Sequence, residues 1–244
     1  MKLQGNTLLI TGATSGIGKA IAKRFLAMGN RVIGTGRNHS VLAQMQEEHA
    51  HFTGIAADLR SPVSLQQLVE TVQQQHAGIN ILINNAGIQH QYSWLDAAEA
   101  WEKIDEELNV NLVAPLKLTA ALVPVLKSNP DPVVVNISSA LAIVPKQSAP
   151  VYCASKAGLH IFSKALRYQL EKAGIQVMEV LPPLIDTPMT EGRHTGEETP
   201  ESLTDQFIKA FQRNRTEINI GKTGKLRLLH RIAPNWADNI LKNG

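Results

Sequence analysis

The segment Thr7-Leu8-Leu9-Ile10-Thr11-Gly12-Ala13-Thr14-Ser15-Gly16-Ile17-Gly18 combines two kinds of pattern near the start of the chain. Residues 7–11 are apolar or β-branched, which predicts a buried strand. Apolar side chains then recur at helical spacing over residues 17–28. The glycines between these patterns follow G-x-x-x-G-x-G, and we expect them to form the turn that joins the strand to the helix.

Each glycine of this turn has a physical role. Gly12 permits the tight turn, Gly16 lets the backbone approach a phosphate, and Gly18 allows the helix and the strand to pack closely. The N–H groups and the dipole at the start of the helix favour a bound anion. By themselves, three glycines after a strand fit a simple turn about as well as a phosphate site.

The alternation of β-branched runs and helical patterns continues to about residue 181, which is typical of βαβ units. We expect strands at 7–11, 31–34, 52–57, 80–84, 133–137 and 176–181, and helices over 17–28, 61–76, 96–127 (two helices) and 152–172. This pattern predicts an α/β fold with a single domain, a Rossmann-type doubly wound parallel sheet with helices on both faces. The 244 residues contain no internal repeat or linker.

The last quarter of the chain has a different composition. Residues 183–216 are rich in proline, glycine, threonine and glutamate, and we expect a lid over the carboxyl ends of the strands, with Phe207, Ile208 and Phe211 as its apolar face. Residues 217–221 are the expected last strand. Residues 222–244 form a basic amphipathic tail, which packs on its own domain or on a second subunit, or contacts an anionic membrane surface.

Composition excludes several classes of function. The formal charge is only +3, the basic residues are scattered, and three Trp, three Tyr and five Phe are too few for base stacking, so we expect no nucleic-acid partner. Eight dispersed histidines predict no metal site. We expect neither a signal peptide nor an integral membrane segment, because we identify no apolar run near the roughly 20 residues that such a segment needs. Cys153 is the only cysteine, which fits a cytoplasmic location; it is either a small buried side chain or a reactive thiol.

Tyr152 and Lys156 are four residues apart and share one face of the helix expected at 152–172. A phenol titrates near pKa ~10, and a nearby ammonium favours the phenolate, so we expect Lys156 to lower the pKa of Tyr152. Such a pair is suited to proton transfer near neutral pH. Tyr-x-x-x-Lys is common by chance, and alone it is equally a half-buried helix start.

Five motifs occur in a fixed order. They are the glycine segment, Asn84-Asn85-Ala86-Gly87, Asn109-Val110-Asn111-Leu112, Ser138-Ser139, and Tyr152 with Lys156. With these motifs, residues 5–190 resemble the short-chain dehydrogenase/reductase family. The resemblance implies an NAD(P)-dependent oxidoreductase that interconverts a small-molecule carbonyl and an alcohol by hydride transfer. A non-catalytic nucleotide-binding redox sensor or scaffold on the same fold is the alternative.

The resemblance assigns four catalytic residues. Tyr152 is the implied general acid, and Lys156 lowers its pKa and holds the nicotinamide ribose. Ser139 donates a hydrogen bond to the substrate oxygen, with Ser138 as the alternative. Asn111 positions a water that links Lys156 to solvent. The implied subunit arrangement is a homodimer or homotetramer built through 96–127 and 152–172.

The cofactor site follows from the same resemblance. The implied residues are Gly12, Thr14, Ser15, Gly16, Ile17, Gly18, Arg37, Asn38, Asp58, Leu59, Asn85, Ala86, Gly87, Tyr152, Lys156, Pro182 and Thr187. Arg37, with no acid beside it at the end of the second strand, favours NADP(H) over NAD(H), whereas a plain surface arginine is the alternative. Asp58 either accepts from the adenine amino group or caps the next helix. Thr187 matches the residue that binds the carboxamide.

Two features depart from the family. Leu181-Pro182-Pro183-Leu184 stands where the family has Pro-Gly, which changes the backbone near the nicotinamide and weakens the placement of Thr187. These prolines and the basic tail resemble a bacterial subgroup of oxidoreductases named for the D-alanylation of lipoteichoic acid, although no residue here points to that substrate. We expect one pocket wall from Ile88, Gln89, His90, Tyr92 and Trp94, and another from Ala140, Leu141 and Val144.

Overall fold

The computed structural model describes residues 1–95, 97–190 and 198–242. A parallel sheet of seven strands runs through these residues in the order β3-β2-β1-β4-β5-β6-β7. The strands are β1 (Thr7–Thr11), β2 (Arg31–Gly36), β3 (Phe52–Ala56), β4 (Ile81–Asn84), β5 (Val133–Ile137), β6 (Gln176–Leu181) and β7 (Glu217–Asn219). The strand order reverses between β1 and β4, as in a doubly wound sheet. The predicted fold class is therefore confirmed.

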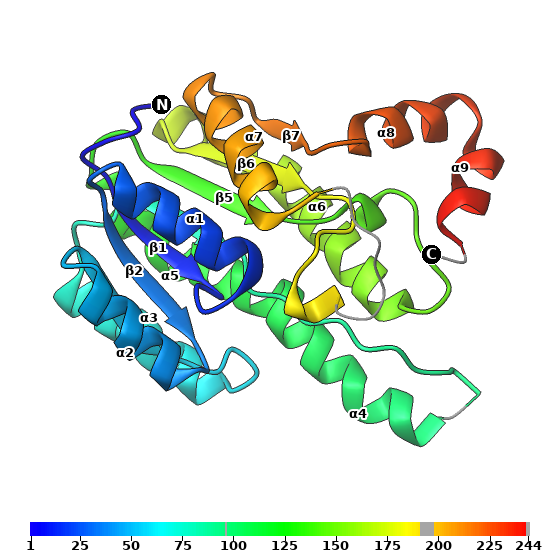
Figure 1. Cartoon of the computed structure of the whole chain (residues 1–244), viewed down its shortest axis with the longest axis horizontal. Coiled ribbons are helices and arrows are strands. Elements are labelled where there is room, and N and C mark those ends of the chain that lie inside the picture. Colours follow the sequence, from blue (N-terminus) through cyan, green and yellow to red (C-terminus); the bar gives the residue numbers. More distant parts are fainter. Residues whose placement is uncertain (96, 191–197, 243–244) are drawn as a thin grey trace.

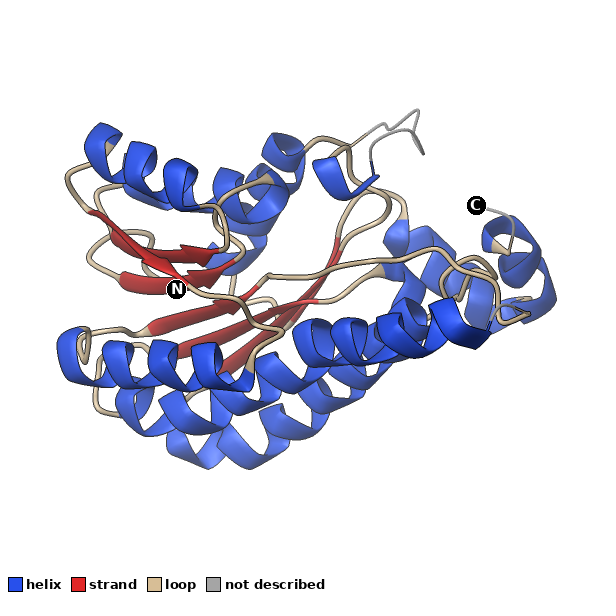
Figure 2. Ribbon diagram, turned by 90° about the horizontal axis from the view of Figure 1, so that it is seen from below, coloured by secondary structure: helices blue, strands red, loops and turns tan. Residues whose placement is uncertain are grey.

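Helices cover both faces of this sheet (Figures 1 and 2). They are α1 (Gly16–Ala27), α2 (His39–Glu48), α3 (Pro62–Gln75), α4 (Ala97–Leu108), α5 (Ala114–Lys127), α6 (Pro150–Leu170), α7 (Pro200–Gln212), α8 (Thr223–Ile232) and α9 (Pro234–Leu241). A π-helical segment, η1 (Asn109–Val113), joins α4 to α5, and short 3₁₀ turns lie at Ala140–Ala142, Glu171–Ala173 and Pro188–Thr190.

The core lies in two layers, one on each face of the sheet. Leu8 and Ile10 of β1 point toward α1 and α7, whereas Leu9 between them packs on the opposite face, which α3, α5 and α6 cover. This alternation follows from the two-residue period of a strand. Because both faces are covered, β5 is buried along its whole length, as its nearly continuous apolar sequence predicts.

The expected lid divides into parts with different surroundings. Phe207 and Phe211 of α7 are fully buried. Phe211 packs edge-on against Phe25 of α1 and against Phe207, and the Phe207 ring is tilted against Phe25. The apolar face that we expected on a lid is therefore part of the core. Residues 191–197 lie outside the described residues, and the segment Pro182–Thr190 remains close to the site described below.

The two helices expected over 96–127 run on from one another, because residues of η1 keep helical backbone angles at both junctions. The run Ala100–Lys127 is long and apolar enough, by length and composition alone, to cross a membrane. The sequence analysis did not identify an apolar run of this length. Its residues Leu118, Leu122 and Leu126 recur every four positions and pack into the core layer on the sheet. We interpret the run as a core helix for this reason.

Candidate functional site

A cavity of about 530 Å³ lies where the strands end. Its lining comes from the residues that directly follow β1 to β6, from α6, and from the C-terminal helices. Of the sequence-predicted residues, it brings together Gly12, Thr14, Ser15, Gly16, Ile17, Arg37, Asp58, Leu59, Asn85, Ala86, Gly87, Ser139, Tyr152, Lys156, Pro182 and Thr187. Open α/β sheets bind ligands at this edge because the carboxyl ends of parallel strands and the helix N-termini meet there.

Three of the predicted residues do not line the cavity. Gly18 lies behind the glycine turn, where an added Cβ would stand 2.2 Å from the Gly12 carbonyl oxygen. The Asn38 side chain caps α2, accepting from the Val41 N–H at 3.1 Å. Asn111 is fully buried in η1. Gly18 therefore supports the turn by close packing, and the Asn38 side chain is used in a helix cap.

The glycine turn forms a cradle for an anion. Gly12 has a φ of +69°, a conformation that favours glycine. Among the described residues, Ser15 makes no side-chain cap bond and α1 has no acid in its first turn, so its N–H groups remain available. The Asn85 side chain fixes the turn by donating to the Thr11 carbonyl oxygen at 2.9 Å. These features fit the pyrophosphate of a dinucleotide cofactor.

Arg37 follows β2 at the rim of the cavity and is exposed. The preceding Gly36 lies against Thr14 of the glycine turn, since a Cβ there would come within 2.7 Å of the Thr14 side chain. The second strand thus ends directly beside the phosphate cradle. Arg37 is close enough to Asp58 for its charge to lower the pKa of that carboxyl, after the larger effect of Arg60.

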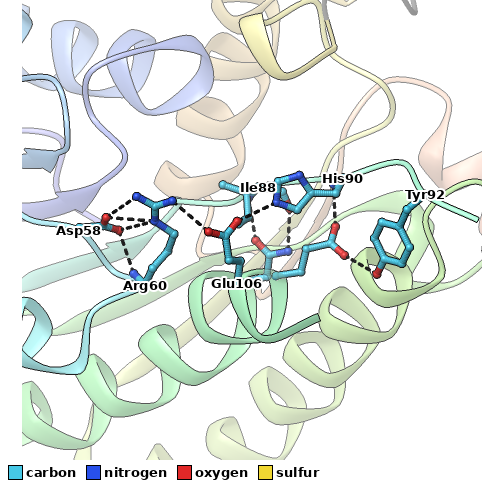
Figure 3. Close-up of polar contacts among 8 residues, drawn as sticks. Asp58, Arg60, Ile88, His90, Tyr92 and Glu106 are labelled. Atoms are coloured by element: carbon cyan, nitrogen blue, oxygen red, sulfur yellow. Dashed lines mark hydrogen bonds and ion pairs between the residues drawn. The ribbon is translucent and has the colours of Figure 1, made fainter. Parts of the chain in front are cut away.

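Arg60, which the sequence analysis missed, also lines the cavity, and Figure 3 shows its contacts with Asp58 and Glu106. Its guanidinium donates to both carboxylate oxygens of Asp58 at 2.6–3.0 Å and to Glu106 of α4 at 3.0 Å. Ser61 caps α3 instead of Asp58, so the cap alternative for Asp58 is wrong. The proximity of Arg60 to Asp58, two residues away, was the only available signal in the sequence.

The loop after β4 is fastened to α4 (Figure 3). The His90 ring contacts Glu106 at 3.1 Å, and the buried Glu107 accepts from the His90 N–H at 2.9 Å and from the Tyr92 hydroxyl at 3.1 Å. Burial and the adjacent Glu107 raise the pKa of Tyr92. Of the wall expected from this loop, only Ile88 and Gln89 line the cavity; His90, Tyr92 and the exposed Trp94 do not.

Tyr152 lies in the first turn of α6, which begins at Pro150, and it is 9% exposed. Burial raises its pKa to about 12, and the hydrogen bond with Ser139 opposes that rise. Desolvation disfavours the phenolate more than its surroundings stabilise it, so the net shift of this pKa is upward, opposite in direction to the lowering expected from Lys156. Ser138 donates its hydroxyl to the Val180 carbonyl oxygen at 3.2 Å, which leaves Ser139 as the serine beside the phenol.

Lys156 lies one turn further along α6 and is 3% exposed. Its Nζ donates to the Ile137 carbonyl oxygen at 2.9 Å and lies 5.8 Å from the centre of the Tyr152 ring. Burial lowers the pKa of Lys156 to about 8, against an opposing effect of the Glu179 carboxylate. The predicted pair thus shares one helix face at the cavity wall.

Asn111 connects the π-helical segment to the loop after β4. Its side chain accepts from the Ile88 N–H at 2.9 Å and donates to the Ile88 carbonyl oxygen at 2.8 Å. A Cβ on Gly87 would stand 3.3 Å from the Asn111 Oδ1 and 3.5 Å from the Lys156 Nζ. Asn111 and Lys156 therefore approach the same backbone position from two sides. The expected role of Asn111, to position a water that links Lys156 to solvent, stays a prediction.

The far end of the cavity is closed by segments that lie late in the sequence. Ala140 and Leu141 line it, as expected, but Val144 does not. Both prolines of the Leu181–Leu184 segment and Thr187 lie in the wall, and Pro182 accepts from the Ala140 N–H at 2.8 Å. The C-terminal helices complete it through Lys222, Thr223, Leu226, Ile240 and Leu241. The sequence analysis missed this wall, for which the amphipathic pattern of the tail was the signal.

Two further residue types bear on the chemistry. Cys153 is buried, and burial raises the pKa of its thiol, which favours the structural alternative over a reactive thiol. Over the described ranges, histidine, cysteine, aspartate and glutamate side chains do not gather in groups of three that would hold a metal ion. Tyr152, Lys156 and Ser139 are polar side chains in the lining of the cavity.

Comparisons with known proteins agree with this geometry. Residues 6–198 match the family described as short chain dehydrogenase. An uncharacterized oxidoreductase of Bacillus subtilis (strain 168), DltE, is 37% identical over 93% of this chain and 92% of its own length. A Burkholderia cenocepacia short chain dehydrogenase in complex with NADP has a TM-score of 0.88 at 24% identity, with each chain covered completely.

Two more solved structures carry different nucleotides. A Sphingobium yanoikuyae short-chain dehydrogenase in complex with NADPH has a TM-score of 0.81 at 28% identity, covering 97% of this chain and 94% of the other. A Brucella melitensis 3-ketoacyl-(acyl-carrier-protein) reductase complexed with NADH has a TM-score of 0.81 at 26% identity, covering 91% of this chain and 100% of the other. The matched residues, the fold and the motif order together identify the chain as an oxidoreductase that belongs to the short-chain dehydrogenase family.

Proposed function

We propose that this protein is an NADP(H)-dependent oxidoreductase that interconverts a carbonyl and an alcohol. The observation that carries the proposal is the placement of Tyr152, Ser139 and Lys156 in one wall of a cavity whose other end is the glycine cradle. The cradle would hold the pyrophosphate, and the cofactor would supply the hydride. The protein residues then have to orient the carbonyl and provide one proton.

Each residue of the wall has a distinct task. Tyr152, with its pKa raised to about 12, is protonated at neutral pH and is ready to give its proton to a carbonyl oxygen. The Ser139 hydroxyl, beside that phenol, is placed to donate to the same oxygen. Lys156 lies on the same helix face, where its ammonium would bind ribose hydroxyls and stabilise the phenolate left after proton transfer.

The preference for NADP(H) is supported by Arg37 and by the absence of an acid at the end of β2. Related structures carry NADP(H) and NADH, so the family does not decide the cofactor. We expect Arg37→Ala to weaken NADPH binding at least about tenfold, roughly 1.4 kcal/mol. NADH binding should stay within about twofold, because NADH lacks the 2′-phosphate that the arginine would bind. Titrations that follow nucleotide fluorescence measure both constants.

The matched control for this prediction is Arg31→Ala. Arg31 is an exposed arginine at the opposite end of the same strand, and its loss should change neither constant. Unchanged NADPH affinity in Arg37→Ala, or equal affinity of the wild type for NADH, would refute the cofactor preference and leave the reaction class standing. Failure of both nucleotides to bind would refute the oxidoreductase proposal.

The C-terminal wall should affect the substrate more than the cofactor. Leu226 lines the cavity. Shortening it in Leu226→Ala should raise the KM for a ketone substrate about tenfold, because apolar contact with the substrate is lost. NADPH affinity should not change. Leu228→Ala is the control, since this neighbour on α8 is 59% exposed and outside the lining. Equal kinetics of the two variants in a ketone panel would show that α8 is not a substrate wall.

We further propose that the protein works in the cytoplasm as a homodimer or homotetramer. A single free cysteine supports the reducing compartment. Ile161 and Tyr168 on α6 are 62% and 65% exposed, and an exposed apolar helix face of this kind supports a subunit contact. Light scattering of the purified protein tests the assembly.

A further inference from the structure

A row of four polar side chains crosses the sheet, and its members Asn136 and Glu179 contact α6, the helix that carries Tyr152 and Lys156. The register partner of Asn84 of β4 is Asn136 of β5. Asn136 is in turn the partner of Glu179 of β6, and Glu179 is the partner of Glu217 of β7. Asn84 donates to Asn136 at 2.8 Å, and Asn136 donates to Ser163 of α6 at 2.8 Å. The neutral part of the row is thus hydrogen-bonded to the sheet and to the helix above it.

Glu179 is the unusual member of this row, because it is a carboxyl group with 1% exposure. Its Oε2 contacts the His160 Nδ1 of α6 at 2.8 Å. Within the described parts of the chain, its Oε1 has no hydrogen-bond partner. Burial of a carboxyl group is costly unless nearby groups compensate its charge, so its surroundings need an explanation.

Those surroundings include the face of α6 that carries Tyr152 and Lys156. Tyr152, Lys156 and His160 follow one another at intervals of four on α6 and therefore share a face. The Lys156 Nζ donates to the carbonyl oxygen of Ile137, whose register partner on β6 is Val180. Val180 directly follows Glu179. The backbone carbonyl that binds the ammonium thus lies on β5 beside the residue that follows Glu179 on β6.

The other charged groups near Glu179 are engaged elsewhere. Arg227 of α8 pairs with Glu217, and Arg167 of α6 lies 3.7 Å from the same carboxylate. Glu179 raises the pKa of His160 through their hydrogen bond, and it opposes the lowering of the Lys156 pKa by burial. The charged groups from the elements packed around Glu179 are therefore Lys156, His160, Arg167, Glu217 and Arg227. Of the basic groups in this set, His160 is hydrogen-bonded to Glu179, and the pKa of Lys156 is raised by its charge.

We propose that Glu179 is a positioning residue for Lys156: its buried carboxylate, fixed by His160, keeps the lysine in its ammonium form beside the Tyr152 phenol. The inference rests on the proposed function for the role of Lys156, but the charge effect itself does not require turnover. A lysine buried without this anion would lose its proton more readily, since desolvation favours the neutral amine. A smaller fraction of the lysine would then be present as the cation that binds ribose hydroxyls and stabilises a phenolate.

The direct test is the pH dependence of Lys156 acetylation by acetic anhydride, read by mass spectrometry from pH 6 to 10. Only the neutral amine reacts, and Lys156 lines the cavity, so the reagent can reach it. Acetylation of Lys156 in the wild type should have its midpoint at about pH 8. Glu179→Gln should move the midpoint about one pH unit lower, because it removes the anion and keeps the side-chain size. Glu179→Asp, which keeps the charge, should retain most of the wild-type midpoint.

Two variants complete the design. Glu179→Leu is a second neutral variant, since buried ionic sites often accept an apolar side chain of similar volume; circular dichroism identifies which neutral variant folds. Glu171→Gln, at an exposed carboxyl just after α6, should match the wild type. A folded neutral variant with the wild-type midpoint overturns the inference. Since labelling needs no substrate, a wild type without reductase activity would overturn only the proposed function.

Discussion

Tyr152→Phe should reduce kcat/KM for carbonyl reduction by about 10²–10⁴-fold while NADPH affinity stays within about twofold. The variant loses only the phenol oxygen, which in the proposed function carries the proton for the carbonyl. Its pKa of about 12 means that the wild-type phenol is protonated throughout the neutral range. The reduction rate should therefore not rise on acidification from pH 8 to 6 through this group. NADPH consumption with a panel of aldehydes and ketones measures the effect.

The control for this prediction lies on the same helix. Tyr168 of α6 is 65% exposed on its outer face, so Tyr168→Phe should leave the kinetics unchanged. If Tyr152→Phe reduces ketones as fast as the wild type, the general acid is another group. A redox sensor or scaffold is the better interpretation if the wild type binds NADPH but reduces no carbonyl, and if a partner protein binds the wild type and Tyr152→Phe equally well.

The raised pKa also predicts a direction for the reverse reaction. Alcohol oxidation requires an acceptor for the hydroxyl proton, and a phenol protonated at neutral pH is a poor one. Oxidation should therefore become faster as pH rises, whereas reduction should not. The positive charge of an oxidised nicotinamide would favour the phenolate when bound, so the rise can begin below the pKa of the free chain.

The central strands of the fold were predictable because they are apolar, largely β-branched runs that are buried on both faces. Val133–Ile137 is covered on both faces and reads as a continuous apolar run, so its limits agree with the sequence. Helix α2 was missed because it has only Leu42 and Met45 in the core, too few for a helical period. The lid was expected from composition, which does not reveal that Phe207 and Phe211 pack on Phe25.

The candidate site divides in the same way. Residues that directly follow a strand could be placed at the cavity, because the topology of a parallel sheet puts them there. Arg60 could not, since its position depends on Glu106, which is 46 residues away in the sequence. The closing wall from α8 and α9 depends equally on distant packing. The pKa of Tyr152 is set by burial, which spacing along a helix does not report.

The glycine turn is the part of the site where the sequence and the structure agree most closely, and Gly18→Ala tests it. We expect this variant to lose about 3 kcal/mol or more of unfolding free energy and to bind NADPH at least about tenfold more weakly. The added Cβ would lie 2.2 Å from the Gly12 carbonyl oxygen and 2.4 Å from the Asn85 Nδ2. Both atoms belong to the cradle, and Asn85 is itself bonded to Thr11, so neither can move without opening the turn. Urea denaturation and nucleotide titration measure the two effects.

The sign of this prediction separates close packing from helix propensity. Replacing glycine by alanine inside a helix normally stabilises it by up to about 1 kcal/mol, so propensity alone predicts a gain for Gly18→Ala. The control Gly78→Ala, where a Cβ would meet nothing within 4 Å, should leave stability and NADPH affinity nearly unchanged. A Gly18→Ala protein as stable as the wild type, with undiminished NADPH binding, would mean that α1 can shift away from β1 without harm. The cradle would then not require the close approach that places the N–H groups of α1 at the phosphate site.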